Sequence, residues 1–232
     1  MVLKAGARIG RRGSTVTLYK MSYSPRRLSR FGILGLVGLL AALVLAGCGV
    51  SNEPTLSSIS QFQSIPGDPL PAPGATLNQT TGGTWDFQKP ASDKITLLYF
   101  GYTSCPDVCP LTMADIAGAL KAVPASVRDK VAVEFVSTDP HRDTIAQLRT
   151  WLGRIDPSFA GGRAPIQTVI AAARAYGISI TAPTVTKKNY KVTHGAQVLV
   201  LDDKGGDVGY FRELAGLKAI TKALPILVKR YA

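Results

Sequence analysis

The sequence predicts an α/β domain in which a sheet of parallel strands is extended by a C-terminal β-hairpin. Apolar runs of strand length alternate with segments of helical periodicity, in the order β–α–β–α–α–β–β–α. Near the C-terminus, a turn at residues 202–206 separates two strand-like runs and marks the hairpin. Alternating strands and helices form mainly parallel sheets, and this order of elements is that of the thioredoxin fold.

Each element is predicted from its own pattern. Strands are runs rich in β-branched and aromatic residues, and helices carry apolar residues three or four positions apart. Pro110 suits the first position of a helix, whereas Pro225 is expected to kink or break the last one. The predicted strands are residues 84–87, 95–100, 131–137, 197–201 and 207–211, and the predicted helices are residues 111–122, 143–152, 165–176 and 214–229.

The positive charge of the chain is concentrated at its N-terminus. The 232 residues carry a formal net charge of +12. The first 47 residues contain eight of the 27 basic residues and none of the 15 acidic ones, so the remainder carries 19 against 15, or +4. A folded domain with so small an excess has no electrostatic footprint for nucleic acid, and we expect no nucleic-acid partner.

The same 47 residues have the pattern of an export signal. A basic group at residues 26–30 precedes an apolar run, residues 31–46, that closes in Leu45-Ala46-Gly47-Cys48. This tetrapeptide resembles a bacterial lipobox, whose cysteine is lipidated. A membrane-spanning anchor is the alternative, but the run is shorter than the roughly 20 residues that a span needs. We therefore expect residues 1–47 to be a signal peptide with a lipobox, and Cys48 to be lipidated.

Such a signal implies a location at the extracytoplasmic face of the bacterial cell membrane, with a lipid anchor. Residues 48–75 are rich in Ser, Pro, Gly and Gln, which predicts a flexible tether, and residues 76–232 are the expected folded domain. Outside the cytoplasm thiols are not kept reduced by glutathione. In that location a pair of cysteines either is kept reduced for a function or forms a disulfide.

Two cysteines four residues apart, Cys105 and Cys109, are the strongest candidates for chemistry. They follow the buried run 95–100, and Pro106 and Pro110 keep the segment from being a regular helical turn. The N-terminus of the following helix favours anions and should lower the pKa of the thiols. Three interpretations stay open: a metal site, a redox dithiol, or a structural disulfide, whose short loop would gain little stability.

The chain has two histidines, His141 and His194. His194 stands just before a predicted strand, at a connection that a thioredoxin-like layout brings close to the N-terminus of the first helix. It should therefore face the cysteines, although a single histidine is more often structural. His141 is expected at a solvated helix start, with Asp139 or Asp143 as the helix cap.

Three separated motifs resemble the SCO/SenC family of copper proteins over roughly residues 76–230. They are Phe100-Gly101-Tyr102-Thr103-Ser104-Cys105-Pro106-Asp107-Val108-Cys109-Pro110, then residues 138–144, and then His194 ahead of residues 198–202 and Gly205. The resemblance implies a thioredoxin-like fold with extra β-hairpin elements, and copper bound by Cys105, Cys109 and His194. Asp139 matches an acidic residue of the second motif. Ser104 and Thr193 depart from the family pattern, which commonly has histidine and aspartate there.

The resemblance implies a membrane-tethered metallochaperone, not an enzyme, that delivers copper during assembly of the binuclear copper centre of cytochrome c oxidase. The expected partners are the copper-binding subunit of the oxidase, a copper donor protein, and the membrane through the lipid anchor. The alternative is a thiol–disulfide reductase that maintains the cysteines of the oxidase copper site. A third hypothesis is an extracellular interaction module with an incidental disulfide.

The donor set agrees with this resemblance. Two thiolates and one imidazole suit Cu(I), whereas Cu(II) would recruit a further oxygen or nitrogen donor. A structural zinc site would need a fourth protein ligand. Asp107 and Asp139 are either solvated or capping carboxylates, or groups that support the ligands from outside the metal sphere. Met113 is expected in the core.

Overall fold

The computed structural model describes residues 54–185 and 190–232, which form one eight-stranded sheet with helices on both faces. The strand order is β1-β8-β7-β4-β5-β6-β2-β3. The central strands β4, β5 and β6 are parallel, and antiparallel strands extend the sheet on both sides. The strands are β1 (Phe62–Ser64), β2 (Thr76–Gln79), β3 (Thr84–Asp86), β4 (Ile95–Gly101), β5 (Val131–Ser137), β6 (Ala160–Arg163), β7 (Val198–Leu201) and β8 (Asp207–Phe211).

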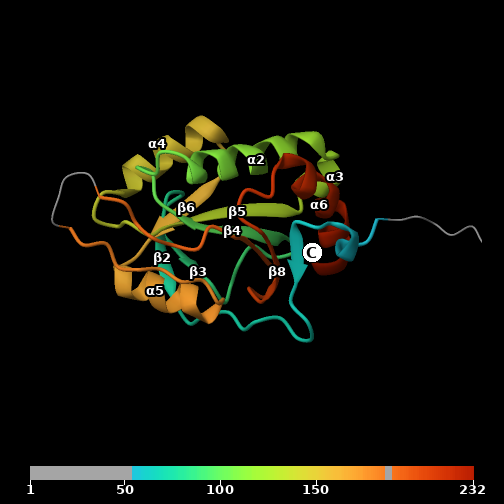
Figure 1. Ribbon diagram of the computed structural model, residues 1–232, viewed down its shortest axis with the longest axis horizontal. Helices are drawn as coiled ribbons and strands as arrows, with labels where there is room; N and C mark the ends of the chain where they lie inside the picture. The colour runs from blue at the N-terminus through green and yellow to red at the C-terminus, as the bar shows by residue number, and fades with distance from the viewer. Residues whose placement is uncertain (1–53, 186–189) are drawn as a thin grey trace, which may run out of the picture. The chain divides into compact units, whose positions relative to one another are not determined.

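The helices form two layers around this sheet, as Figure 1 shows. Helices α2, α4 and α6 pack on one face, and α5 packs on the other, each face with its own apolar cluster. The helices are the 3-10 turn η1 (Leu56–Ser58), α2 (Val108–Ala122), the short α3 (Ala125–Arg128), α4 (Ile145–Ile155), α5 (Ile166–Ala175) and α6 (Leu217–Tyr231).

Strand β4 is at the centre of the core. All seven of its residues are buried. Leu97 and Tyr99 enter the cluster under α2, whereas Leu98 and Phe100 enter the cluster under α5. A strand with both faces covered needs a continuous apolar run, which is the pattern that predicted it. The sequence-based α/β, thioredoxin-like fold is confirmed, and β5 and β8 begin and end at the predicted residues.

Two helix starts differ from the prediction. Helix α2 begins at Val108, not at residue 111, so Cys109 is its second residue. Pro110 is tolerated there because the first backbone N–H groups of a helix have no intrahelical partner. Helix α4 is capped by Thr144, which forms a capping box with Gln147. The expectation that Asp139 or Asp143 caps this helix is therefore wrong.

Helix α6 continues through Pro225 without ending there. Pro225 is exposed, while its neighbour Leu224 and the following Leu227 are fully buried against the core. We infer that this packing offsets the hydrogen bond that a proline removes from a helix interior.

Strand β6 could not be predicted from the sequence, because its two central residues are glycines and it lacks the apolar pattern of a strand. A side-chain carbon on Gly161 would lie 2.6 Å from Leu152, and one on Gly162 would lie 2.8 Å from Leu77. The strand must therefore be built from glycine, which sequence patterns associate with turns. The short strands β1 and β2 were also missed.

The folded domain begins earlier than the expected boundary at residue 76. Leu56, Ile59 and Phe62 are buried in the cluster under α2, and β1 pairs with β8. From residue 54 onward, the segment predicted as a flexible tether is therefore packed onto the sheet. The predicted signal peptide, its lipobox and Cys48 lie outside the described residues. Within residues 54–185 and 190–232, no helix is long and apolar enough to cross a membrane.

Candidate metal centre

The three predicted ligands lie at the C-terminal end of β4. Cys105 is in the loop after the strand, Cys109 is in the first turn of α2, and His194 precedes β7. The Cys109 sulfur is 3.8 Å from Nε2 of His194. Both Cys105 and His194 line a hollow of about 300 Å³, together with Tyr102, Asp107 and Glu213 among others. The fold therefore brings together groups that are 85 residues apart along the chain.

Backbone contacts hold the His194 ring in one orientation. His194 forms an isolated bridge with Ile180, and the flanking hydrogen bonds run from the N–H of Gly195 to Ser179 and from the N–H of Thr181 to Thr193. Nδ1 of His194 is 2.9 Å from the carbonyl oxygen of Gly195. Because a carbonyl only accepts, Nδ1 carries the proton and Nε2 presents its lone pair towards Cys109. Burial lowers the pKa of His194, which favours this neutral form.

The two thiols differ in their ease of ionisation. Burial raises the pKa of Cys109 to about 12. Burial also opposes ionisation of the half-buried Cys105, but hydrogen bonds from the backbone N–H groups of Asp107 and Cys109 and from the side chains of Cys109 and Tyr102 together lower the pKa of Cys105. The expectation that the helix N-terminus activates both thiols therefore holds for Cys105 and is wrong for Cys109.

The geometry of Cys109 and His194 fits a shared metal ion. Sulfur and nitrogen donors at about 2.3 and 2.0 Å from one ion, at a near-trigonal angle, lie about 3.7 Å apart. In the described part of the chain, however, no three His, Cys, Asp or Glu side chains stand ready to hold an ion. Both Cys105 and Cys109 are free thiols. The Cys109–His194 pair is thus in place, and Cys105 lines the same hollow as His194.

The difference between the thiols predicts selective alkylation. At pH 8, iodoacetamide should modify Cys105 at least about 100-fold faster than Cys109, because only thiolates react and a thiol of pKa near 12 is almost entirely protonated. Tandem mass spectrometry can locate the label, since both cysteines fall in the same tryptic peptide. Equal labelling of the two cysteines would contradict the described environments.

Two tyrosines that the sequence analysis did not select surround the pair. The Tyr99 hydroxyl donates to the Cys109 sulfur at 3.7 Å. The rings of Tyr99 and Tyr102 stand edge-on to the His194 ring, with centroids 6.2 and 5.9 Å away. The position of Tyr99 could have been inferred from the alternation of side chains along β4, which places it on the same face as Leu97.

Asp143, which had been considered only as a cap, anchors the cysteine loop. Its carboxylate accepts from the backbone N–H of Thr103 at 3.2 and 3.3 Å, and from the Thr103 hydroxyl at 2.5 Å. It also accepts from the Ser137 hydroxyl at 2.7 Å. Asp143 is fully buried. The start of the loop that carries Cys105 is thereby tied to the end of β5.

Loss of this anchor should destabilise the protein. Asp143→Ala removes the shared acceptor of three donors, two of them part-buried and one buried, and we expect the free energy of unfolding to fall by about 2 kcal/mol. Urea denaturation of the variant and the unchanged protein measures this difference. Asp129→Ala is a matched control, because the Asp129 side chain is 72% exposed and should cost little. An equal effect of the two substitutions would refute the anchoring role.

The two aspartates predicted to support the ligands differ in their surroundings. Asp107 is exposed at the N-terminus of α2 and lines the hollow. Asp139 is fully buried, and its carboxylate accepts from Arg142 and, at 2.6 Å, from the Tyr190 hydroxyl. The Arg142 guanidinium also lies over the Tyr190 ring, 3.8 Å from its centroid. Asp139 therefore fastens the segment leading to His194, while a role for Asp107 stays a prediction.

Fold and site together define a thioredoxin-like protein that collects a thiol pair and a neutral imidazole at the N-terminus of its first long helix. The model of the SCO1/SenC family matches residues 76–229, and the chain belongs to this family. A curated relative from Stutzerimonas stutzeri, whose name describes copper binding, is 29% identical over 129 residues, 56% of this chain and 63% of the relative.

Solved structures of Sco proteins have the same fold. Apo Sco1 of Thermus thermophilus is 26% identical, with a TM-score of 0.61 over 72% of this chain and 96% of that one. ScoI of Bradyrhizobium japonicum with copper bound is 27% identical, with a TM-score of 0.56 over 73% of this chain and 100% of that one. The matches span from 39% to 63% of the length of the curated relatives.

Proposed function

We propose that this chain is a copper metallochaperone that binds Cu(I) through Cys105, Cys109 and His194. The observation that carries the proposal is the 3.8 Å approach of the Cys109 sulfur to the unprotonated Nε2 of His194. Two sulfur donors and one imidazole are the ligands that Cu(I) prefers. Relatives named for copper binding, or solved with copper bound, support the choice of metal.

The contrast between the cysteines suits a carrier. Cys109 is buried in the core, whereas Cys105 is on a loop and lines the hollow together with His194. Copper held by a movable third ligand can be passed to another thiol by exchange of one ligand at a time. Proteins of the SCO family are cytochrome c oxidase assembly proteins, and we propose the binuclear copper centre of the oxidase as the recipient.

Location is part of the same proposal. The basic and apolar N-terminal segment that closes at Cys48 supports a lipoprotein at the extracytoplasmic face of the bacterial membrane. The oxidase copper centre would then be within reach of a tethered domain. Labelling of cells with a radioactive fatty acid should mark the chain, and a Cys48→Ala variant should lose both the label and the membrane association.

A thiol–disulfide reductase is the second candidate, and one observation favours it. The lowered pKa of the accessible Cys105 provides an attacking thiolate, and the adjacent Cys109 can resolve the mixed disulfide. The two electrons that reduce the target disulfide would come from this thiol pair, which itself becomes a disulfide. This reaction needs no histidine.

Two mixtures separate the candidates. In the first, the Cu(I)-loaded chain meets the reduced, copper-free copper-binding domain of the oxidase. In the second, the copper-free, reduced chain meets the same domain with its cysteines oxidised. Delivery predicts copper transfer in the first mixture and its loss in His194→Ala. Disulfide reduction that is unaffected by His194→Ala, without any copper transfer, would support the reductase instead.

A further inference from the structure

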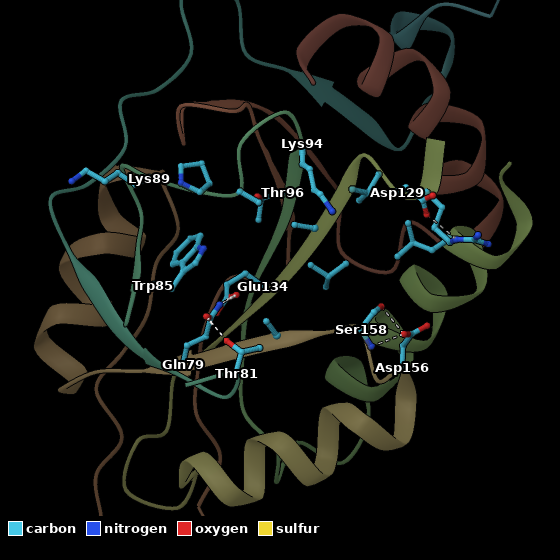
Figure 2. A pocket seen from close by; sticks show the side chains of 18 of the residues that line it. Gln79, Thr81, Trp85, Lys89, Lys94, Thr96, Asp129, Glu134, Asp156 and Ser158 are labelled. Carbon is cyan, nitrogen blue, oxygen red and sulfur yellow. Dashed lines mark hydrogen bonds and ion pairs between the residues drawn. The ribbon is translucent and has the colours of Figure 1, made fainter. Parts of the chain in front are cut away.

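A second cavity lies at the other end of the sheet from the candidate metal centre. It has a volume of about 770 Å³ and lies at the N-terminal ends of β4, β5 and β6. Figure 2 shows side chains from the β2–β3 hairpin, the start of β4 and the middle of β5 around it. This volume is in the range of cavities that hold small organic ligands. Cys105, Cys109 and His194 do not line it.

An unpartnered carboxyl group lines this cavity. Glu134, on β5, is 2% exposed, and its Oε2 accepts from Nε2 of Gln79 at 2.7 Å. Its Oε1 has no hydrogen-bond partner within the described residues. Burying a polar atom without a partner costs roughly 1 to 3 kcal/mol. Glu134 pairs with Leu98 of β4, and an apolar residue would be tolerated at this position. The presence of a buried carboxyl group with an unpaired oxygen there therefore needs an explanation.

A second unpaired polar atom lies near the start of β4. Thr96, on β4, is 1% exposed, and its hydroxyl oxygen likewise has no partner among the described residues. Apolar side chains, Trp85 and Pro90 among them, also line the cavity. The cavity thus combines an apolar wall with hydrogen-bonding groups at its inner end.

The opening of the cavity carries an excess of positive charge. The basic residues that line it are Lys89, Lys94, Lys121 and Arg128, against the acidic Asp129 and Asp156 at the rim. Lys89 and Lys94 form no ion pair in the described part of the chain. Such a rim repels cationic ligands and favours an anionic group. The same rim argues against an ammonium partner for Glu134.

We propose that this cavity binds a small amphipathic organic anion. Its acidic group lies at Lys94, its apolar body rests against Trp85, and its inner polar group hydrogen-bonds with Glu134 and Thr96. The ligand satisfies the two buried oxygens and leaves its charge in the solvent-accessible rim. The site is separate from the metal centre and does not depend on the proposed copper function.

Energy transfer from Trp85 to a fluorescent anion tests the site. The probe is 8-anilinonaphthalene-1-sulfonate, which joins an aromatic body to a sulfonate and carries an N–H group. The chain has two tryptophans, so Trp151→Phe in the full chain leaves Trp85 as the only donor. We expect saturable energy transfer with a Kd in the micromolar range, and displacement of the probe by octanoate. The uncharged parent compound, N-phenyl-1-naphthylamine, should bind at least about tenfold more weakly.

Three further substitutions make the test specific. Lys94→Glu should weaken probe binding at least about tenfold, and Thr96→Val about fivefold, the value of one hydrogen bond of about 1 kcal/mol. Lys218→Glu, an equal change of charge at an exposed position of α6, should leave the Kd within twofold. Thr96→Val removes an unpaired buried hydroxyl and should not unfold the protein. The proposal is overturned if Trp85 shows no saturable transfer, or if the three variants bind the probe alike.

Discussion

Replacing His194 by alanine should weaken Cu(I) binding at least about 100-fold. The substitution removes the only imidazole within the site and leaves the two thiols, while the sheet and its core stay intact. Loss of a group that merely orients a metal ligand already costs about 10- to 100-fold in affinity, so loss of a ligand should cost more. Competition with a chromophoric Cu(I) chelator under reducing, oxygen-free conditions measures the change.

The second histidine provides the control for this experiment. His141 is exposed in the middle of the β5–α4 connection, and it does not line the hollow that contains Cys105. His141→Ala should therefore keep the affinity within about twofold. If His194→Ala retains the native affinity for Cu(I), the imidazole is not a ligand, and the proposed site is reduced to the two cysteines.

Raising the pH from 5 to 8 should cost the native protein about 3 to 4 kcal/mol of stability through Glu134 alone. Burial raises the pKa of Glu134 from 4.5 to about 8. The folded state therefore holds a proton that the unfolded state releases above pH 4.5. The stabilising contribution is fully present below pH 4.5 and is lost as the pH rises through 8, at about 1.4 kcal/mol per unit of pKa shift.

Glu134→Gln isolates this effect. Glutamine has the shape of the protonated carboxyl group and does not ionise, so the variant should lose this part of the pH dependence. Urea denaturation at pH 5 and pH 8 gives the free energies of unfolding for both proteins. Comparing the two proteins cancels the contribution of Asp207, whose pKa burial raises to about 7. Parallel pH profiles for the two proteins would show that Glu134 is ionised in the fold.

The elements that could be predicted from the sequence are those whose residue pattern reflects their burial. Strands β4, β5 and β8 are apolar runs closed by turn residues, and they were located to within one residue. Strand β6 was missed because close contacts with Leu152 and Leu77, far away along the chain, impose its glycines. The segment from residue 54 has loop-like composition, yet it is ordered by burial of Leu56, Ile59 and Phe62.

In the candidate site, too, some features could be predicted from the sequence and others could not. The cysteine spacing and the position of His194 relative to β7 were enough to predict their proximity, and the structure places Cys109 beside His194. The different acidities of the two thiols could not be predicted, because they depend on the depth of Cys109 in the core. The supporting contacts of Asp143 with Thr103 and of Asp139 with Tyr190 join residues 40 and 51 positions apart. No local pattern encodes them.

X-ray absorption spectroscopy of the Cu(I)-loaded, reduced chain identifies the donor atoms of the proposed copper site. We expect a three-coordinate ion with two sulfur donors and one nitrogen donor, and the loss of the nitrogen in His194→Ala. A native spectrum with sulfur donors alone, or one that His194→Ala leaves unchanged, would contradict a copper site shared by Cys105, Cys109 and His194.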